Sequence, residues 1–392
     1  MDPGELKAAA DRLSPELVGW RRRLHQHPEL GFEEQETAAL VARTLRGLGL
    51  DVRERVATTG VVGLLRAKRA GSARPAVLLR ADMDALPIQE VEGREYGSQI
   101  PGRMHACGHD GHMTMLLGAA TLLVEEREKL DRDVVFCFQP GEEGFGGAQA
   151  MIKAGVLRDH GVGEAYGLHL WSPYPVGTIQ VRPGPMMAAQ DEFEATVRGR
   201  GGHGAAPHTT IDPIVAAAQA VVALQAVVAR HVDPLHAAVV TVGSLHAGTA
   251  ANIIPDAAVM RGTLRSFDDG VRKTLREGSR RVLEQISAAH GCRCDFTLHE
   301  GYPAVVNDAA AAERVRRHAA EVVGETRVIE PPPVAAAEDF AYFLEAVPGA
   351  FAFIGAGNAE RGITAPHHAA AFDIDETALP IGAELLARIA LG

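Results

Sequence analysis

The chain has 392 residues, of which 46% are hydrophobic and 23% are charged, the balance of an ordinary soluble globular protein of about two to three domains. A formal net charge of −11 argues against nucleic acid as a partner, because phosphate binding needs clustered Lys and Arg. The most apolar run, Ile214 to Val228, carries two Gln and falls short of the ~20 apolar residues of a membrane-spanning helix, so no membrane contact is expected. The one basic cluster, Arg21 to Arg23, is predicted to be a solvated helix face.

The N-terminal segment lacks a charged region followed by an apolar one, so we expect no export signal. The four Cys are too few and too scattered for a disulfide framework. A cytoplasmic location is therefore expected. Aromatic residues make up only 5% of the chain, and the prevalence of Ala, Val and Leu favours layers of helices and sheet over a β-sandwich.

The first 180 residues alternate between helical and strand patterns. Apolar residues at three-and-four spacing predict helices over Pro15 to Leu24, Thr37 to Leu48 and His112 to Val124. Short apolar runs predict buried strands over Ala76 to Leu79, Val134 to Phe138, Ala165 to Leu170 and Gly177 to Val181. Because helices separate the strands, we expect a parallel or mixed sheet covered on both faces, with ligands bound beyond the carboxyl ends of its strands.

From about Met187 the order changes to strand, helix, strand, strand, helix, strand, which is the ferredoxin-like arrangement. Its predicted elements are 193–198, 212–230, 238–245, 257–266, 268–290 and 292–298. Alternation of helix and strand then resumes at 309–323, 337–344, 350–354 and 377–391, with Pro331 to Pro333 as a rigid loop of this returning half. We therefore predict a two-domain α/β protein, in which a catalytic domain with a mixed or parallel sheet (1–186 and 300–392) is interrupted by a ferredoxin-like α+β domain (187–299).

A thiol and three imidazoles lie within eight residues, between His105 and His112. Cys107 and His109 alternate around Gly108, so in a loop both could face one ion. Thiolate and imidazole form a ligand set that suits Zn and that Mn, Co or Ni can also use. The alternative is that these His cap a helix or pack in a core.

Two adjacent carboxylates, Glu142 and Glu143, follow directly after a predicted buried strand. Adjacent residues point different ways, so one can bind a metal while its neighbour transfers a proton. An ordinary acidic turn is the alternative. Two further signals, each weak alone, are His169 at the end of the third strand and the pair His367 and His368 near the C-terminus.

Five candidate donors result: Cys107, His109, Glu143, His169 and one of His367 and His368. Five exceed the three or four protein ligands that one catalytic Zn takes. They fit two divalent metals that share a bridging donor and a water, with Glu142 left over as a base. Metal-assisted hydrolysis is the reaction that this inventory suits best.

Several motifs follow one another along the chain: Arg22–His25 with Pro28–Leu30, Leu79–Pro87, Met104–Asp110, Gln139–Glu143, Gly201–His203 with Pro207–His208, Asn252–Asp256, Glu338–Phe340 and His368. This ordered set resembles the M20 metallopeptidase family, in particular its amidohydrolase branch, over almost the whole chain. That branch contains aminoacylases, hippurate hydrolases, auxin-amino-acid conjugate hydrolases and N-acetyl-diaminopimelate deacetylases.

The resemblance implies a metal-ligand set of Cys107, His109, Glu143, His169 and His368. It also implies that Glu142 is the general base and acid. His368 is preferred to His367 because the residues from Phe372 to Glu376 then fall at the family's offsets, although alanines replace the family's usual proline after the motif. Asp84 is similar to a group that orients an imidazole, with a strand-end cap as the alternative.

The inserted domain resembles the family's lid and dimerisation domain. The resemblance implies that His203, in a glycine-rich loop, reaches the active site of a neighbouring subunit and stabilises the oxyanion. It implies that Asn252 and Arg265 bind the substrate's carboxylate, with an ion pair on the strand face as the alternative for Arg265. A homodimer or higher homo-oligomer is therefore expected.

We predict a di-metal amidohydrolase that cleaves the amide bond of N-acyl amino acids (N-acetyl, benzoyl or similar), with two divalent ions of Zn, Mn, Co or Ni. One alternative is a dipeptidase or carboxypeptidase of the same fold, which differs in the pocket for the acyl side. Another is a metal-dependent binding protein without turnover, which the pair Glu142 and Glu143 argues against because a binder needs no base. A structural zinc site is disfavoured because such sites close four ligands around the ion.

Overall fold

The computed structural model describes residues 3–68 and 74–392, and the chain forms two compact units. The larger unit runs to Met186 and resumes over Val306–Pro332 and Asp339–Gly392, and the smaller unit comprises Met187–Val305 and Pro333–Glu338. The smaller unit thus ends at Val305 rather than at residue 299. It also contains Pro333, which belongs to the loop that we predicted for the returning half.

An eight-stranded mixed sheet forms the middle layer of the larger unit, in the order β1-β2-β4-β3-β5-β16-β6-β15. Its strands are β1 (Asp51–Val56), β2 (Gly60–Leu65), β3 (Ala76–Asp82), β4 (Val134–Gln139), β5 (Val162–Pro175), β6 (Ile179–Gln180), β15 (Val328–Ile329) and β16 (Gly349–Gly357). β3 pairs in parallel with β4 and β5, and β5 pairs in parallel with β16. The carboxyl ends of these four strands therefore meet at one edge, where a ligand site is expected.

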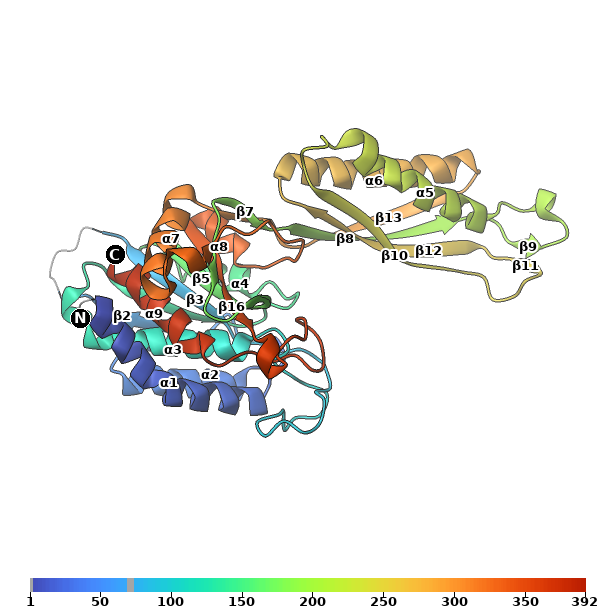
Figure 1. Cartoon of the computed structure of the whole chain (residues 1–392). Coiled ribbons are helices and arrows are strands. Elements are labelled where there is room, and N and C mark those ends of the chain that lie inside the picture. The colour runs from blue at the N-terminus through green and yellow to red at the C-terminus, as the bar shows by residue number, and fades with distance from the viewer. Residues whose placement is uncertain (1–2, 69–73) are drawn as a thin grey trace. The chain divides into compact units, whose positions relative to one another are not determined.

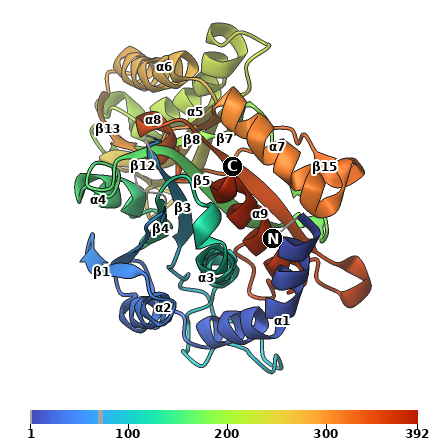
Figure 2. The same cartoon turned by 90° about the vertical axis from the view of Figure 1, so that its left-hand side faces the viewer.

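Helices cover both faces of this sheet (Figure 2). On one face, α1 (Pro3–Gln26), α3 (His109–Glu125) and α9 (Ala378–Leu391) pack against one another, flanked by α2 (Gln35–Gly47) and α7 (Ala309–Val323). On the other face lie the short helices α4 (Gly147–Lys153) and α8 (Ala341–Ala346). All seven residues of β3 are buried because layers of helices lie above and below it.

The N-terminal part of the larger unit differs from the predicted elements in two places. Helix α1 begins at Pro3 and continues through Pro15, where we expected a helix to begin. Leu6, Ala10 and Leu17 are buried at helical spacing on both sides of Pro15, so their packing outweighs the one backbone hydrogen bond that the proline cannot make. The hairpin of β1 and β2 was not predicted: β1 is largely exposed and rich in charge, and the buried apolar run of β2 was overlooked.

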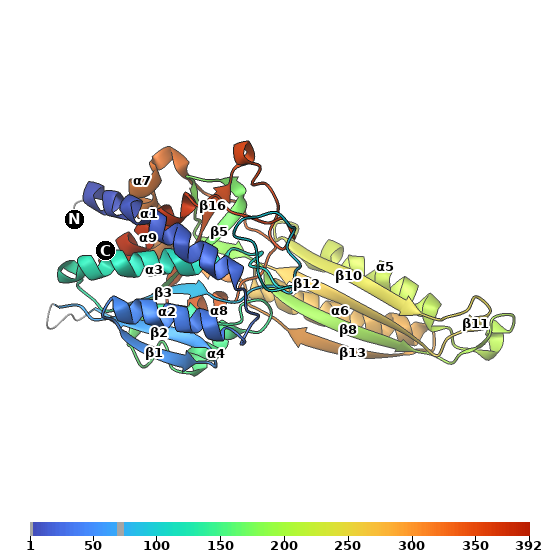
Figure 3. The ribbon, with the colours of Figure 1, turned by 90° about the horizontal axis from the view of Figure 1, so that it is seen from below.

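The smaller unit has the predicted order of strands and helices. These elements are β8 (Ala189–Arg198), α5 (Pro213–His231), β10 (Ala238–Ala247), β12 (Ala257–Ser266), α6 (Asp269–Ala289) and β13 (Arg293–Glu300). The strands form an antiparallel sheet in the order β10-β12-β8-β13, with both helices along one face (Figures 1 and 3). The mixed sheet together with this separate antiparallel unit confirms the predicted α/β fold class.

Two further two-stranded sheets complete the described chain. One pairs β9 (Gly202–His203) with β11 (Ile253–Ile254), near the end of the smaller unit's sheet where β8 ends and β12 begins (Figure 3). The other pairs β7 (Gly184–Met187) with β14 (Val305–Asn307).

Helix α5 is, within the described ranges, the one helix with the length and apolar composition to cross a membrane. This corrects the expectation that no segment reaches that threshold. Six of its residues are buried at spacings of three and four, namely Pro213, Ala216, Ala217, Ala220, Leu224 and Val227. Because this stripe packs on the sheet and on α6, we interpret α5 as a core helix of the smaller unit.

Candidate metal centre

The predicted donors of the larger unit converge at the carboxyl edge of its sheet. Asp84 follows β3, Glu142 and Glu143 follow β4, and His169 lies on the long strand β5. His109 opens helix α3, and the loop before it carries Cys107. His368 comes from the loop that precedes α9, so segments more than 250 residues apart in sequence meet at one place.

His169 presents one defined ring nitrogen to Cys107. Its Nδ1–H donates to the backbone carbonyl oxygen of Leu170 at 2.7 Å, which leaves Nε2 unprotonated in the neutral ring. That Nε2 lies 3.6 Å from Sγ of Cys107. Histidines that ligate metals usually donate their second ring N–H in this way, so the side chain is already oriented as a ligand.

His109 and Glu143 are linked through Asp84. Nδ1 of His109 lies 3.3 Å from Oδ1 of Asp84, and the backbone N–H of Glu143 donates to Oδ2 of Asp84 at 2.9 Å. Nε2 of His109 then faces Oε1 of Glu143 at 3.9 Å. Asp84 therefore holds two predicted ligands, as a residue that orients an imidazole would.

The structure distinguishes the two adjacent histidines His367 and His368. Nε2 of His368 lies 3.2 Å from Oε1 of Glu143, and its backbone N–H donates to the carbonyl oxygen of Ala106 at 2.8 Å. His368 has a φ of 63°, a left-handed conformation that is uncommon for residues other than glycine and that recurs at functional sites. Its ring therefore lies beside the Glu143 carboxylate, and its role as a ligand stays a prediction.

His367 has a different environment. Its Nε2 accepts the backbone N–H of Ser172 at 3.2 Å, and its Nδ1 lies 3.9 Å from Sγ of Cys107. The ring packs on Trp171 and Phe372. With Nε2 accepting, Nδ1 carries the proton and points it at the sulfur of Cys107, so His367 is a supporting group rather than a donor.

The donor atoms form overlapping groups whose members lie within 4.8 Å of one another. Cys107 groups with His109 and His169, Cys107 also groups with Glu143 and His368, and His109 groups with Glu142 and Glu143. Ligands around one Zn at its usual bond lengths are about 3.3–3.8 Å apart, so the measured separations of 3.2–3.9 Å fit. Cys107, His109 and Glu143 each belong to two of these three groups, so the donors form one connected cluster.

Two features of the donor set fit a bound cation. Nε2 of His109 and Oε1 of Glu143 are buried and make no hydrogen bond within the part of the chain that the structure describes. Burial, with the carboxylates of Glu143, Glu142 and Asp82, raises the pKa of the Cys107 thiol well above its ordinary value. A divalent cation would supply the missing partners and offset this negative charge, so that the thiolate could form.

The acidic surroundings also act on the histidines. Burial alone would lower the pKa of His109, but Asp82, Asp84 and Glu143 outweigh it and raise the pKa to about 10. His169 has the opposite environment, because burial and the neighbouring rings of His112 and His367 hold its pKa well below the ordinary value. His169 therefore remains a neutral nitrogen donor, and His109 becomes one when a cation replaces its proton.

Glu142 lies at the same edge as the donors. Its side chain is buried, and its carboxylate groups with His109 and Glu143. Because Glu142 and Glu143 are adjacent at a strand end, their side chains leave the backbone in different directions. Both carboxylates thus lie near His109, and of the two only Glu143 also groups with Cys107 and His368 among the described residues.

Asp82 and His112 are residues of the site that sequence reasoning missed. Nδ1 of His112 lies 2.6 Å from Oδ1 of Asp82, and Nε2 of His112 accepts the backbone N–H of Leu170 at 2.8 Å. Both nitrogens of His112 are therefore occupied, which excludes it as a ligand. Burial would raise the pKa of Asp82, but Arg80, His109 and His112 hold it well below the ordinary value. The segment Arg80 to Asp84, noted only as part of a motif, was the available signal.

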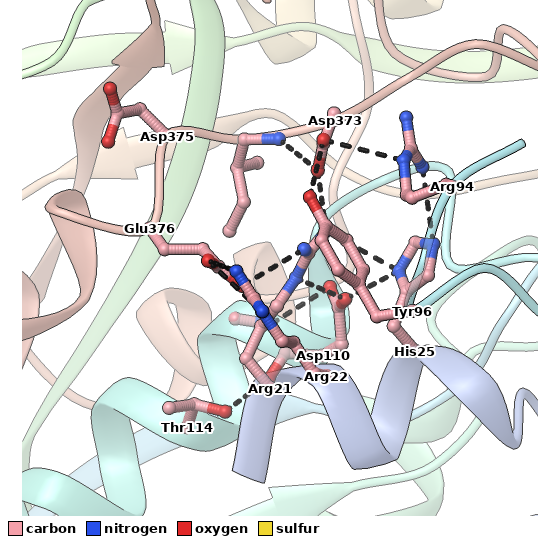
Figure 4. A network of polar contacts seen from close by, with 12 residues as sticks. Arg21, Arg22, His25, Arg94, Tyr96, Asp110, Thr114, Asp373, Asp375 and Glu376 are labelled. Carbon is pink, nitrogen blue, oxygen red and sulfur yellow. Dashed lines mark hydrogen bonds and ion pairs between the residues drawn. The ribbon is translucent and has the colours of Figure 1, made fainter. Parts of the chain in front are cut away.

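The prediction of a solvated helix face at Arg21 to Arg23 is wrong for Arg21. Its side chain is fully buried, and the guanidinium lies 2.9 Å from Asp110 and 2.9 Å from Asp373 (Figure 4). His25, one turn later on α1, lies 2.8 Å from the same Asp110 oxygen. Since Asp110 follows His109 and Asp373 lies five residues after His368, this network joins the two segments that carry these donors.

Three predicted site residues lie in the smaller unit. His203 and Asn252 are exposed neighbours, because β9 pairs with β11 and the Gly204 N–H donates to the Asn252 carbonyl at 2.8 Å. Nδ1 of His203 accepts the backbone N–H of Ala205 at 3.0 Å, which leaves Nε2–H as an outward donor.

Arg265 is not brought together with Asn252. In the strand register, Arg265 pairs with Gln190 near the end of β12. The strand between Ala257, where β12 begins, and Arg265 is about 26 Å long at ~3.3 Å per residue. Its guanidinium donates to Oε1 of Gln190 at 2.5 Å, and the charge of Glu192 acts on it from nearby. A strand-face pair with Glu192 thus stays the alternative for Arg265, and Asn252 and Arg265 of one chain cannot hold the same small carboxylate.

The chain is similar to known proteins along nearly its full length. A family model described as "Peptidase family M20/M25/M40" matches residues 78–392. Thermostable carboxypeptidase 2 of Saccharolobus solfataricus is 41% identical over 391 residues, which cover 99% of this chain and 98% of that protein. N-acetyl-L-cysteine deacetylase of Bacillus subtilis is 44% identical over 367 residues, which cover 94% and 85%. The crystal structure of the YXEP protein of Bacillus subtilis, described as a dinuclear metal binding peptidase, matches with a TM-score of 0.84 at 36% identity and covers 97% and 98% of the two chains.

Proposed function

The chain belongs to peptidase family M20/M25/M40, as its motifs predicted, and from this premise we propose that it is a metal-dependent amidohydrolase acting on N-acyl amino acids. The observation that carries the proposal is the end of β4, where Glu143 lies among the donor atoms and Glu142 is buried beside it. A protein that only bound metal would have no use for this second carboxylate. We further propose two divalent ions, because the five clustered donors exceed the three or four that one catalytic Zn takes and the similar YXEP protein is described as dinuclear.

In the proposed mechanism, Cys107, His109, Glu143, His169 and His368 would hold the ions, which when bound would supply a Lewis acid for the amide carbonyl and for the attacking water. Glu142 accepts the proton that the attacking water loses and returns it to the nitrogen of the leaving amine. Asp84 keeps His109 and Glu143 in place through the contacts described above. Zn suits this mixture of sulfur, nitrogen and oxygen donors, and Mn, Co and Ni are further candidates.

One relative and one side chain support the proposed substrate class. N-acetyl-L-cysteine deacetylase, at 44% identity, acts by its name on an N-acyl amino acid. Arg265 offers a guanidinium that donates to the neutral amide of Gln190, and such a group suits the carboxylate of an amino acid. We therefore assign Arg265 to the substrate's carboxylate.

We also propose that the active enzyme contains at least two copies of the chain. Within one smaller unit, about 26 Å of strand separates Arg265 from His203 and Asn252. One small substrate can therefore contact all three residues only if two copies of the chain contribute them. The exposed apolar residues Ile214, Val215 and Val222 on α5 support a contact with a second copy. In such an assembly, Nε2–H of the second copy's His203 would stabilise the oxyanion.

A dipeptidase or carboxypeptidase is the second candidate, because thermostable carboxypeptidase 2 is 41% identical over almost the whole chain. One experiment separates the candidates. The purified chain is loaded with Zn, Mn, Co or Ni and assayed for release of free amino acid from N-acetyl and N-benzoyl amino acids and from dipeptides. The proposal expects faster turnover of the N-acyl substrates and loss of activity with a chelator. Preference for dipeptides would favour the second candidate, and turnover of neither panel would contradict both.

A further inference from the structure

Glu34 is a buried carboxyl group that no step of the proposed reaction uses. It precedes helix α2, yet its side chain caps nothing on that helix. Glu29 takes that role, since its carboxylate accepts the backbone N–H groups of Glu36 and Thr37 at 3.2 and 2.9 Å. Glu34 is instead 0% exposed and turns inward. Burying a carboxylate costs free energy, which its hydrogen bonds must offset. Glu34 makes two such bonds, and because neither caps α2, they indicate another role.

The two hydrogen bonds of Glu34 join distant segments. Oε1 accepts the backbone N–H of Gly141 at 2.9 Å, in the loop after β4, and Oε2 accepts the hydroxyl of Thr59 at 2.5 Å, in the turn between β1 and β2. Gly141 immediately precedes Glu142. Its φ is 60°, and a Cβ at this position would lie 3.0 Å from the ring of Phe32. The backbone is therefore tightly enclosed at the residue before the proposed base.

Glu142 thus lies between two backbone amides that are each tied to a buried carboxylate. The backbone N–H of Gly141, the residue before Glu142, donates to Glu34. The backbone N–H of Glu143, the residue after it, donates to Oδ2 of Asp84 at 2.9 Å. The carbonyl oxygen of Gly141 also accepts the N–H of Gly147 at 3.0 Å. A displacement of Gly141 would change where the carboxylate of Glu142 reaches. Gly141 and Glu34 themselves carry none of the predicted metal-ligand atoms.

We propose that Glu34 is a positioning residue, whose carboxylate fixes the backbone of Gly141 and so sets the reach of Glu142. The proposal rests on the proposed role of Glu142. Glu34 touches none of the predicted metal ligands, so it acts on proton transfer rather than on metal binding. A misplacement of about 1 Å in a reacting group can cost ~10²-fold in rate, so a backbone clamp of this kind has a measurable effect.

The ionisation of Glu34 falls near neutral pH. Burial raises its pKa to about 7, and the nearby charge of Asp84 adds to the rise, while the donors Thr59 and Gly141 oppose it. Asp84 is the charged group that acts on Glu34 among its described neighbours. A hydrogen bond to an ionised acceptor is about twice as strong as one to a neutral acceptor, so the clamp on Gly141 strengthens as the pH rises through about 7.

The test compares Glu34→Ala, Glu34→Gln and Thr59→Val with Glu33→Gln, a matched change at the exposed neighbour. Glu34→Ala is expected to lower kcat at least tenfold, with KM and metal content within twofold of wild type. Gln can still accept from Gly141 and donate to Thr59, so Glu34→Gln should keep most of kcat. The ratio of wild-type to Glu34→Gln kcat should nevertheless rise between pH 6 and 8. Unchanged kcat in Glu34→Ala, metal loss in proportion to kcat, or a ratio that is constant with pH would overturn the proposal.

Two readouts do not depend on activity. Amide hydrogen exchange in residues 136–147 of the metal-free protein should be faster in Glu34→Ala than in Glu33→Gln, and equal exchange would overturn the proposal. Because the folded-state pKa lies above the ordinary value of 4.5, wild-type protein should lose stability relative to Glu34→Gln as the pH rises from 4.5 through about 7. If Glu34→Ala does not fold, Thr59→Val removes one donor and should show the same exchange effect. A wild-type chain that hydrolyses neither panel would contradict the proposed function alone, since the exchange measurement still decides the role of Glu34.

Discussion

Nδ1 of His109 lies 3.3 Å from Oδ1 of Asp84, and this contact directs the other ring nitrogen of His109 toward Glu143. The second oxygen of Asp84 accepts the backbone N–H of Glu143, so one buried carboxylate orients two predicted ligands. The relationship explains why an acid lies beyond β3 without being among the donors. It also leads to the first prediction.

Asp84→Asn should lower metal affinity about 10- to 100-fold, the usual cost of losing a partner of a ligating histidine. The amide can still accept from Glu143, but its NH₂ group cannot accept the proton on Nδ1 of His109. Titration with a chelating indicator dye would measure the affinity, with Glu33→Gln as the control. Equal affinities in the two variants would contradict the role assigned to Asp84.

Cys107→Ser should reduce the amount of bound metal, because the sulfur belongs to two donor groups and a hydroxyl is a poor ligand near neutral pH. Elemental analysis after dialysis gives the ratio of metal to protein. Cys294→Ser, at a partly exposed thiol of the smaller unit, is the matched control. Retention of the full metal content in Cys107→Ser would remove Cys107 from the ligand set.

Glu142→Gln and Glu143→Gln should separate base from ligand at adjacent positions. Glu142→Gln is expected to keep its metal and to lose about 10²- to 10⁴-fold in kcat, the range of a general base. Glu143→Gln is expected to lose metal together with activity, because its carboxylate lies near His368 and His109. Measuring metal content and kcat on the same samples distinguishes them, and a Glu142→Gln enzyme that turns over normally would refute the proposed mechanism.

Arg21→Met should lower the free energy of unfolding of the larger unit by about 3–5 kcal/mol, because it leaves the carboxylate of Asp110 buried without its main cationic partner. Burial would raise the pKa of Asp110, and it is chiefly Arg21, with His25, that holds this pKa far below the ordinary value. Arg23→Met, at the exposed neighbour, should change stability by less than about 0.5 kcal/mol. Urea unfolding at pH 7 measures both, and similar midpoints would show that the network adds little to stability.

Asp191→Asn should destabilise the smaller unit by about 3 kcal/mol near neutral pH, since Arg272 and Arg276 both donate to this buried carboxylate. Burial would raise the pKa of Asp191, but the two arginines outweigh it and lower the pKa to about 2. A depressed pKa contributes stability that is present above the ordinary value of 3.8 and is lost as the pH falls through about 2. The difference between wild type and variant should therefore shrink between pH 4 and pH 2 in urea unfolding, and a difference that stays constant would contradict this assignment.

Periodicity and capping predicted most of the fold. The helix at Pro213 starts as expected because Asp212 caps it, its side chain accepting the N–H of Ile214, and the strand 257–266 matches its predicted range. The hairpin of β1 and β2 was not predicted because an exposed, charged edge strand lacks the alternation that marks a half-buried strand. Helix α1 passes through Pro15 because packing on both sides of the proline decides its boundary, and that packing is not visible in a local window.

The predicted donors could be recognised because their residue types in motif order limit the chemistry. The supporting residues could not be, since a side chain supports a ligand through its place in the fold. In the sequence, Arg21 resembled an exposed basic residue. It is buried and pairs with Asp110 and Asp373, which lie 89 and 352 positions further along the chain. Glu34 carries no local signal for the same reason.

By itself the sequence determined the family, the order of helices and strands, and which residues could act as donors or bases, because these depend on residue type and local spacing. Only the tertiary structure decided which nitrogen of each histidine faces the site, that the ring of His367 is held by the backbone of Ser172, and that Asn252 and Arg265 lie far apart. These features depend on hydrogen bonds and strand register between distant segments, and such contacts exist only after the chain has folded.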